Sequence, residues 1–300
     1  MKKTFVLTLI LVGCGGLLAS RRRILGSLRS RFHPLWRLRQ SSLYRRFQGR
    51  VDRTVFVGVP GSGFRVAVKL LRDASLWLSQ SASEPEIQKC FSAVFETVQP
   101  RVFWDIGGNI GYYSWLTLSQ CEGVDVVIFE ADQTNYDLIS QTISRNNLAS
   151  RARAVHAAVS DQDGTVQFLV DPVSGATGAI VAQEQTGFGS SLHAAYGLSQ
   201  TLSVKSLALD TLAQQGYAAP DLMKIDVEGA ERLVINGARA LLRQSKPVII
   251  METTDNDLLQ DLREMGYHIV PLDSSNVLCV PERWRDALVP QVESYAVGAA

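Results

Sequence analysis

A short apolar segment that runs into a cluster of glycines places the strongest limit on how this chain folds. Val102–Ile106 has the length and composition of a buried β-strand, and a helical pattern follows over Gly111–Gln120. Between them, Gly107 and Gly108 lack a β-carbon, so the backbone can bend sharply and approach a ligand closely. Asn109 is one of the few other residues that tolerate a positive φ. We therefore predict a strand, a tight ligand-binding loop and a helix.

The alternation of short apolar strands with amphipathic helices continues along the chain. Wholly apolar strands between helices are typical of a parallel sheet that is covered on both faces. A closing hairpin is expected over 267–271 and 277–280. These patterns predict an α/β fold. The expected strands are 102–106, 125–129, 154–159, 222–227 and 248–251, and the expected helices are 111–120, 135–146 and 230–243.

A smaller β/α extension is expected before the first of these strands. Two strands, 54–59 and 63–70, flank a Pro-Gly turn, and a helix begins at Pro85 with Ser83 as its N-cap. Pro100 ends this helix. The predicted organisation is an apolar leader with an Arg-rich arm (1–50), a hairpin and helix extension (51–100), the main domain (101–285) and a C-terminal tail (286–300).

Charge is distributed unevenly between the two ends of the chain. Residues 1–53 contain two lysines and eleven arginines against Asp52, a net charge of +12, so the remainder carries −11 although the whole chain carries +1. An acidic body argues against a nucleic-acid-binding protein. The four cysteines are scattered without metal-ligand spacing, as expected of reduced thiols.

The apolar stretch from Phe5 to Ala19 is shorter than the roughly 20 residues that span a bilayer. The arginines that follow it favour a cytoplasmic location for the rest of the chain. We expect a cytoplasmic domain, with residues 1–50 either associating with a membrane surface or forming a nonfunctional leader. A secretory signal is a third interpretation.

Two acidic residues at strand ends indicate which cofactor the glycine loop binds. Glu130 ends the strand 125–129, where a carboxylate can bind two ribose hydroxyls. Asp105 can attract a cationic aminoacyl group and would repel a pyrophosphate. The dinucleotide fingerprint G-x-G-x-x-G does not match the observed Asp-x-Gly-Gly-Asn-x-Gly. We therefore predict S-adenosylmethionine as the cofactor, bound by Asp105, Gly107, Gly108, Asn109, Gly111 and Glu130.

Six stretches of sequence carry a family resemblance. They are VFWDIGGNIGYYS (102–114), FEAD (129–132), NNL (146–148), AVSDQDG (158–164), MKIDVEGAE (223–231) and PVIIME (247–252), of which the fifth is the most specific. With these the chain resembles the FkbM-type methyltransferases from roughly Val51 to Gly266. The resemblance implies a seven-stranded class I (Rossmann-like) methyltransferase sheet and O-methylation of a sugar, glycan or natural-product hydroxyl. It also implies that Asp161 lies beside the adenine, with Ser160 nearby.

Three carboxylates at strand ends are the candidates for chemistry on the acceptor. An alcohol needs a general base or a metal ion to lose its proton, and Asp226, Glu228 and Glu252 are placed for this. Asp226 could instead cap the helix that starts near Gly229, and Glu228 could stabilise the positive end of that helix from its first turn. The three could bind a divalent cation, but no histidine supports this, and we predict no metal site.

The segment 172–201 is rich in glycine, serine and alanine. We expect a long loop that covers the acceptor site, with a surface excursion as the alternative. Two other functions stay open: a nicotinamide-dependent oxidoreductase, and a membrane-associated binding protein without turnover. N- and C-methylation stay open as well, and the acceptor and the oligomeric state are not specified by these patterns.

Overall fold

The computed structural model describes residues 47, 50–73, 84–170, 178–181 and 200–296. Contacts divide the chain into two units, Met1–Asp52 and Arg53–Ala300, and the second is described below. The predictions for the leader and arm fall almost entirely outside the described residues. Within the described ranges, no helix combines the length and the hydropathy of a membrane span.

Seven strands form the central sheet in the order β12-β13-β11-β10-β3-β4-β5. All neighbouring strands are parallel except β13, which is antiparallel to both β11 and β12. The chain order reverses between β3 and β10, which is where open α/β sheets bind ligands. This confirms the predicted class I, Rossmann-like methyltransferase sheet. The strands are β3 (Val102–Ile106), β4 (Asp125–Glu130), β5 (Ala152–His156), β10 (Leu222–Ile225), β11 (Val248–Glu252), β12 (Tyr267–Pro271) and β13 (Asn276–Pro281).

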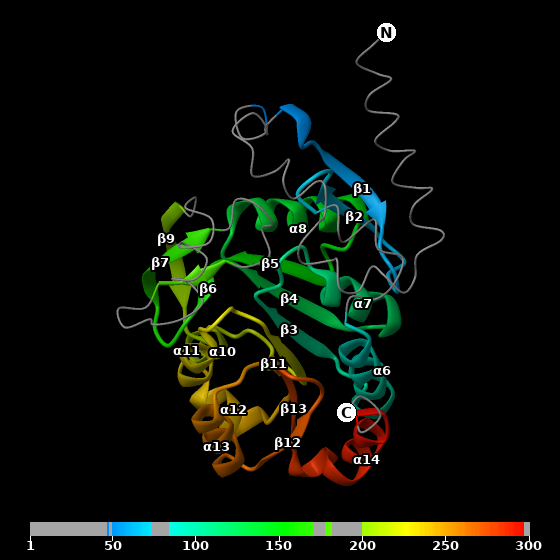
Figure 1. The fold of residues 1–300 in the computed structure, drawn as a ribbon, viewed down its shortest axis with the longest axis vertical. Helices are drawn as coiled ribbons and strands as arrows, with labels where there is room; N and C mark the ends of the chain where they lie inside the picture. The colour runs from blue at the N-terminus through cyan, green and yellow to red at the C-terminus, as the bar shows by residue number, and fades with distance from the viewer. Residues whose placement is uncertain (1–46, 48–49, 74–83, 171–177, 182–199, 297–300) are drawn as a thin grey trace. The chain divides into compact units, whose positions relative to one another are not determined.

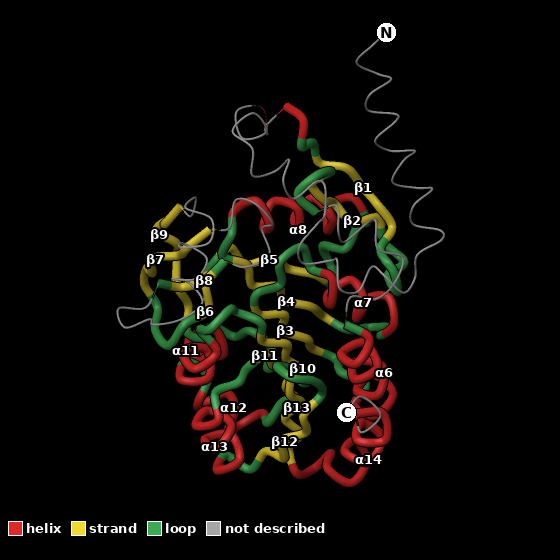
Figure 2. Tube along the Cα trace, in the orientation of Figure 1, coloured by secondary structure: helices red, strands yellow, loops and turns green. Residues whose placement is uncertain are grey.

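Helices cover both faces of this sheet (Figures 1 and 2). Side chains along β11 alternate between the apolar clusters on the two faces of the sheet. Val248 and Ile250 pack on one face, and Ile249 and Met251 pack on the other. One face carries α6 (Pro85–Val98), α7 (Tyr112–Gln120), α8 (Gln133–Arg145) and α14 (Arg285–Ala296); the other carries α10 (Leu209–Gln214), α11 (Glu231–Asn236), α12 (Arg239–Ser245) and α13 (Asn256–Glu264).

The predicted N-terminal hairpin and helix are present. Strands β1 (Thr54–Gly58) and β2 (Arg65–Lys69) pair in antiparallel register. The hairpin lies against α8, where Thr142 Oγ1 accepts the backbone N–H of Ala67 at 2.9 Å. The N-cap of α6 is Glu84 rather than the predicted Ser83, which lies outside the described residues.

The third predicted strand is broken, and its second half belongs to another sheet. Residues 154–159 were expected to be continuous, but β5 ends at His156 and Ala158–Val159 forms β6. A four-stranded sheet in the order β6-β9-β7-β8 follows, with β7 (Gly164–Val170), β8 (Ala179–Ile180) and β9 (Gln200–Leu207). The predicted loop 172–201 therefore includes β8 and the start of β9, and the rest of it lies outside the described residues.

The predicted helix over 230–243 is divided into α11 and α12 at Gly237. A β-carbon on Gly237 would overlap the backbone carbonyl of Ser160, so only glycine fits this approach. The second helix starts anew because the Asp210 carboxylate accepts the N–H groups of Ala240 and Leu241, at 3.0 and 2.8 Å. The residues expected as a C-terminal tail, 286–300, contribute most of α14, which buries Leu288 fully.

Candidate functional site

The glycine loop joins β3 to α7 and lies directly between two neighbouring strands. The N–H groups of Gly107 and Gly108 both donate to the carbonyl of Phe129 at 3.0 Å. A β-carbon on Gly107, which has a φ of 76°, would overlap the carbonyl oxygen of Asp226. Asn109 has the predicted positive φ, at 54°. The loop backbone therefore packs so closely against β4 and the end of β10 that residues with a β-carbon do not fit at its glycine positions.

Glu130 accepts hydrogen bonds from this loop and from the start of α8. Its Oε2 accepts the N–H of Asn109, and its Oε1 accepts the N–H of Asp132, both at 2.7 Å. Burial raises the pKa of Glu130 to about 8, against the effect of these two N–H groups. Each carboxylate oxygen can accept a further hydrogen bond. The Glu130 side chain is therefore held in one orientation, and both of its oxygens can still accept a hydrogen bond from a ligand.

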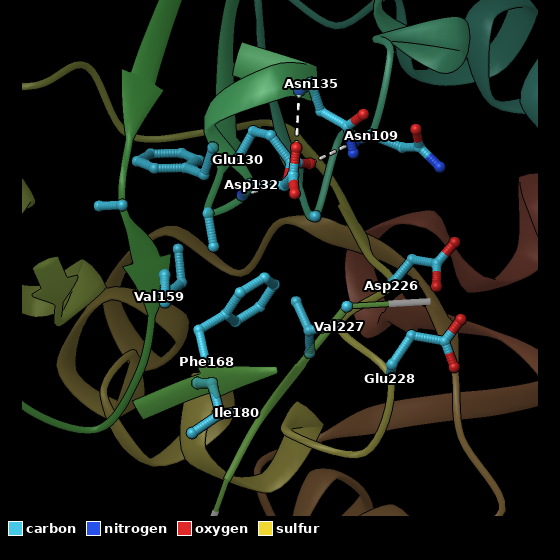
Figure 3. A pocket seen from close by; sticks show the side chains of 16 residues that line it. Asn109, Glu130, Asp132, Asn135, Val159, Phe168, Ile180, Asp226, Val227 and Glu228 are labelled. Carbon is cyan, nitrogen blue, oxygen red and sulfur yellow. Dashed lines mark hydrogen bonds between the residues drawn. The ribbon is translucent and has the colours of Figure 1, made fainter. Parts of the chain in front are cut away.

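A cavity opens at the carboxyl ends of β3, β4 and β10. The space inside it and its open mouth together amount to about 590 Å³. Figure 3 shows Glu130, Asp132 and Asn135 grouped on one side, with Asp226 and Glu228 together on another. The two acidic groups therefore face different parts of one ligand space.

Asp132 and Asn135 line the cavity and were not predicted as site residues. Asp132 is the N-cap of α8, and its side chain accepts the N–H of Asn135 at 2.9 Å. Its position just before a helical pattern is an N-cap signal that could have identified it. Two buried carboxylates on this side of the cavity, those of Glu130 and Asp132, suit hydroxyl donors and disfavour a pyrophosphate.

The remaining wall is apolar and comes from the junction of the two sheets. Ala157, Ala158 and Val159 line the cavity, and Phe168 of β7 and Ile180 of β8 lie close to Val159 (Figure 3). The sequence contains no signal for Phe168 or Ile180, because the second sheet was itself unpredicted. An apolar wall next to hydroxyl-accepting carboxylates matches the chemistry of a nucleoside, with a flat ring and a ribose.

Ser160 and Asp161 are not among the residues that line the cavity. That Asp161 lies beside the adenine, with Ser160 nearby, stays a prediction. Ser160 is buried, and its hydroxyl donates to the exposed Asp161 at 3.1 Å. The backbone of Ser160 lies against Gly237 on the other side of the strand end.

Asp105 lies beneath the glycine loop rather than in the cavity lining. Its Oδ2 accepts the hydroxyl of Ser114 at 2.6 Å, and the side chain is buried. Burial raises the pKa of Asp105, and the Lys224 ammonium opposes this shift. Asp105 therefore has a protein hydroxyl and a protein cation as partners in this structure.

Asp226 and Glu228 form the second acidic group. Asp226 Oδ2 pairs with the buried Lys224 ammonium at 2.6 Å, and the charge of Asp226 acts on Glu252. The three predicted carboxylates are therefore brought together. The alternative that Asp226 caps a helix is wrong, because α11 has Ala230 as its N-cap without a side-chain hydrogen bond.

Glu228 does not lie in the first turn of a helix, as its alternative reading required. The acidic residue in the first turn of α11 is Glu231, and Glu228 precedes the helix with a φ of 51°. This left-handed conformation is uncommon for a non-glycine residue and clusters at functional sites. Burial, followed by the charges of Asp226 and Glu252, raises the pKa of Glu228 to about 8.

Burial, followed by the charge of Asp226, raises the pKa of Glu252 to about 7. Carboxyl groups that titrate near neutrality suit proton transfer at physiological pH. Within the described part of the chain, no group of three or more His, Cys, Asp or Glu side chains is arranged to hold a metal ion. The raised pKa values of Glu228 and Glu252 are suited to proton transfer.

Comparison with known sequences identifies the family. The profile of the Methyltransferase FkbM domain matches residues 105–269, which is more than half of the chain. The chain belongs to the FkbM methyltransferase family. The FkbM domain spans the glycine loop, Glu130 and all three candidate carboxylates of the acceptor side.

Two curated methyltransferases are similar to this FkbM chain. The methyltransferase sdnD of Sordaria araneosa is 25% identical over 151 residues, which cover 44% of this chain and 58% of sdnD. The hexuronic acid methyltransferase AglP of Haloferax volcanii is 24% identical over 156 residues, which cover 52% of this chain and 57% of AglP. The FkbM chain therefore spans somewhat more than half the length of each.

Two solved structures are also similar. The FkbM methyltransferase of Methylobacillus flagellatus has 17% identity and a TM-score of 0.42, covering 60% of this chain and 44% of that one. The O-methyltransferase of Bacillus cereus in complex with SAH has 20% identity and a TM-score of 0.39, covering 70% of this chain and 86% of that one.

One residue outside the matched FkbM domain reaches the acidic side of the site. Glu84, at the start of α6, accepts a hydrogen bond from the Tyr113 hydroxyl. The Lys224 ammonium lies 4.9 Å from the centre of the Tyr113 ring. The negative charge of Glu84 also contributes to the raised pKa of Glu252. The extension before the FkbM domain therefore takes part in the electrostatics of this site.

Proposed function

We propose that this FkbM methyltransferase transfers a methyl group from S-adenosylmethionine to a hydroxyl oxygen of a sugar, glycan or natural-product acceptor. The observation that carries the proposal is one cavity with two separate acidic groups. One group, around Glu130, is oriented to accept hydroxyl donors, and the other contains carboxyl groups that titrate near neutrality.

The cofactor side is formed by the loop and by the end of β4. Glu130 would accept the two ribose hydroxyls. Gly107 and Gly108 let the loop backbone pack against Asp226 and Ile128 beside the cavity. The apolar wall with Phe168 would contact the adenine ring. When bound, S-adenosylmethionine supplies an activated methyl group on a sulfonium.

The acceptor side is formed by the ends of β10 and β11. Glu228 lines the cavity with its carboxyl group available to take the hydroxyl proton. The ion pair with Lys224 holds Asp226 in place, and the charge of Asp226 raises the pKa of Glu252. We therefore assign proton acceptance to Glu228, and orientation of the acceptor to Asp226 and Glu252. The similarity to AglP, a hexuronic acid methyltransferase, supports a sugar acceptor.

Transfer of labelled methyl from S-adenosylmethionine to a panel of hydroxyl acceptors tests this proposal. Because the base must be ionised, and the pKa of Glu228 is about 8, the rate should rise with pH through that value and then level off. Glu228→Gln should lower the rate by about 10²- to 10⁴-fold, with S-adenosylhomocysteine affinity within about threefold of wild type.

A matched carboxylate provides the control for this assay. Glu122 is exposed after α7, so Glu122→Gln should leave transfer unchanged. An equal loss in Glu252→Gln with normal transfer in Glu228→Gln would move the base to Glu252. Labelled amines and no labelled hydroxyls would contradict O-methylation, and saturable cofactor binding without transfer to any acceptor would favour the silent binding protein.

A further inference from the structure

A buried arginine of the N-terminal hairpin reaches the ribose side of the cavity. Arg72 lies in the turn that follows β2 and is 5% exposed. Its Nη2 donates a hydrogen bond of 2.6 Å to Oδ1 of Asn135, a cavity-lining residue in the first turn of α8 that is 3% exposed. The contact therefore joins the extension to the cofactor side of the site inside the protein.

The turn itself orients the guanidinium. Arg72 Nε donates to Oδ1 of Asp73 at 2.8 Å, and Asp73 Oδ2 accepts the backbone N–H of Lys69 at 2.7 Å. The N–H of Asp73 donates back to the Lys69 carbonyl at 3.1 Å. Charge-assisted hydrogen bonds of this kind are stronger than neutral ones. Arg72 is therefore held in position by the hairpin and not by a ligand.

A continuous series of hydrogen bonds leads from Asn135 to the glycine loop. The N–H of Asn135 donates to Asp132 at 2.9 Å, and the N–H of Asp132 donates to Glu130 at 2.7 Å. Glu130 then accepts the N–H of Asn109 at 2.7 Å. Figure 3 shows these groups side by side at one side of the cavity. Arg72 bonds to the side chain of Asn135, whereas the backbone N–H groups of Asn135 and Asp132 make the next two bonds, so Arg72 is linked to Glu130 through the main chain at the start of α8.

We propose that Arg72 is a positioning residue for Glu130 and that it makes the N-terminal extension a part of the cofactor site. This inference rests on the proposed function, in which Glu130 accepts the ribose hydroxyls. Arg72 itself touches no ligand. It fixes the Asn135 side chain, and its positive charge favours the ionised form of the neighbouring Glu130.

The groups around Glu130 shift its pKa in opposite directions. Burial raises the pKa of Glu130 to about 8, and the Asp132 carboxylate contributes in the same direction. The N–H groups of Asp132 and Asn109 and the Arg72 guanidinium lower the pKa of Glu130. Loss of Arg72 should therefore raise this pKa further.

Two other titratable groups lie close to this network. Asp73 neutralises part of the Arg72 charge through their ion pair. His156 on β5 pairs in register with Glu130, and its Nε2 lies 3.1 Å from the carbonyl of Ala131. The positive charge of the Arg72 guanidinium is among the influences that lower the pKa of Glu130.

The pH dependence of S-adenosylhomocysteine binding to the full chain tests the proposal. An ionised carboxylate accepts two hydroxyl donors better than a protonated one, so affinity should rise as pH increases through the pKa of Glu130. Arg72→Met should weaken binding by about tenfold at pH 7 and move the rise to higher pH. Arg72→Lys keeps the positive charge but loses the planar guanidinium group. Its affinity and pH profile should therefore lie between those of the wild type and of Arg72→Met.

Two controls separate this role from a structural one. Arg65 lies on the same hairpin and donates to the Phe56 carbonyl at 2.7 Å, so Arg65→Met should leave the pH profile unchanged. In a Glu130→Gln background the further substitution Arg72→Met should produce no shift of the profile, because the titrating group is gone.

The outcomes distinguish this inference from the proposed function. Wild-type binding with an unshifted profile in Arg72→Met, or a loss that is equal at every pH, would overturn the positioning role. If Arg72→Met fails to fold, the profile of Arg72→Lys decides in the same way. Absence of binding by the wild-type chain would instead contradict the proposed function.

Discussion

Gly107→Ala is expected to abolish S-adenosylhomocysteine binding and to destabilise the fold by several kcal/mol. The new β-carbon would overlap the carbonyl oxygen of Asp226, which belongs to the backbone and cannot rotate away. The φ of 76° adds a cost of about 1–2 kcal/mol for any residue with a β-carbon. The loop must therefore separate from β10, and the cavity between them changes shape. Thermal unfolding and calorimetric titration measure the two effects.

Gly123→Ala is the matched control for this prediction. Gly123 has nearly the same φ, 78°, but a β-carbon there would meet nothing within 4 Å. Gly123→Ala should lower the free energy of unfolding by about 1–2 kcal/mol, which is the cost of the positive φ alone. It should leave ligand affinity unchanged. Equal effects of the two substitutions would show that φ alone matters, and would contradict the close approach of the loop to Asp226.

Lys224→Met is expected to lower the free energy of unfolding by about 3–5 kcal/mol at neutral pH, because it leaves buried carboxylates without their cation. Burial alone lowers the pKa of Lys224, but the Asp226 and Asp105 carboxylates outweigh it and hold this pKa above its usual value. The stabilisation is thus fully present at neutral pH, and on the alkaline side it is lost as pH rises through the pKa of Lys224 in the folded protein.

Acid should reduce the effect of Lys224→Met. Burial raises the pKa of Asp105, and loss of the ammonium raises it further, so this carboxyl group can take up a proton in the variant as pH falls. Chemical denaturation at several pH values measures this. The double variant Lys224→Met with Asp226→Asn should be less destabilised than the sum of the single variants.

The exposed Lys205 of β9 provides the matched control for the lysine. Lys205→Met should change the free energy of unfolding by no more than about 0.5 kcal/mol. A loss in Lys224→Met as small as this, or a loss that does not change with pH, would contradict the assignment of a buried ion pair.

The central sheet could be predicted from sequence because its strands are short, apolar and separated by amphipathic helices. The glycine loop and the positions of Glu130 and Asp226 follow from the same pattern, since side chains at the carboxyl ends of parallel strands meet at one edge. Glu130 on one side of the cavity and Asp226 and Glu228 on the other could therefore be predicted, whereas Asp132 was not.

Long-range contacts account for what the sequence did not predict. The break in the helix at Gly237 depends on the Ser160 carbonyl and on capping by Asp210, both distant in sequence. Phe168 reaches the cavity only because β7 pairs with β9, over a connection that crosses 182–199. The hydrophobic pattern of nearby residues does not predict pairing between distant strands, so the apolar wall of the site was not predicted.

Arg72 illustrates the same limit within the extension. Its neighbours in sequence identify a turn after a strand, and only the docking of the hairpin on α8 brings it to Asn135. A basic residue in a polar turn is ordinarily exposed, and no local signal marks this one as buried.

Calorimetric titration of the full chain with S-adenosylhomocysteine, with NADH as the control ligand, tests the central claim most directly. The account predicts saturable binding of S-adenosylhomocysteine, about 10- to 100-fold weaker in Glu130→Gln because charge-assisted hydrogen bonds to the ribose are lost. Glu122→Gln should bind as wild type does, and NADH should not bind. No S-adenosylhomocysteine binding by the folded chain, or saturable binding of NADH in its place, would contradict the account.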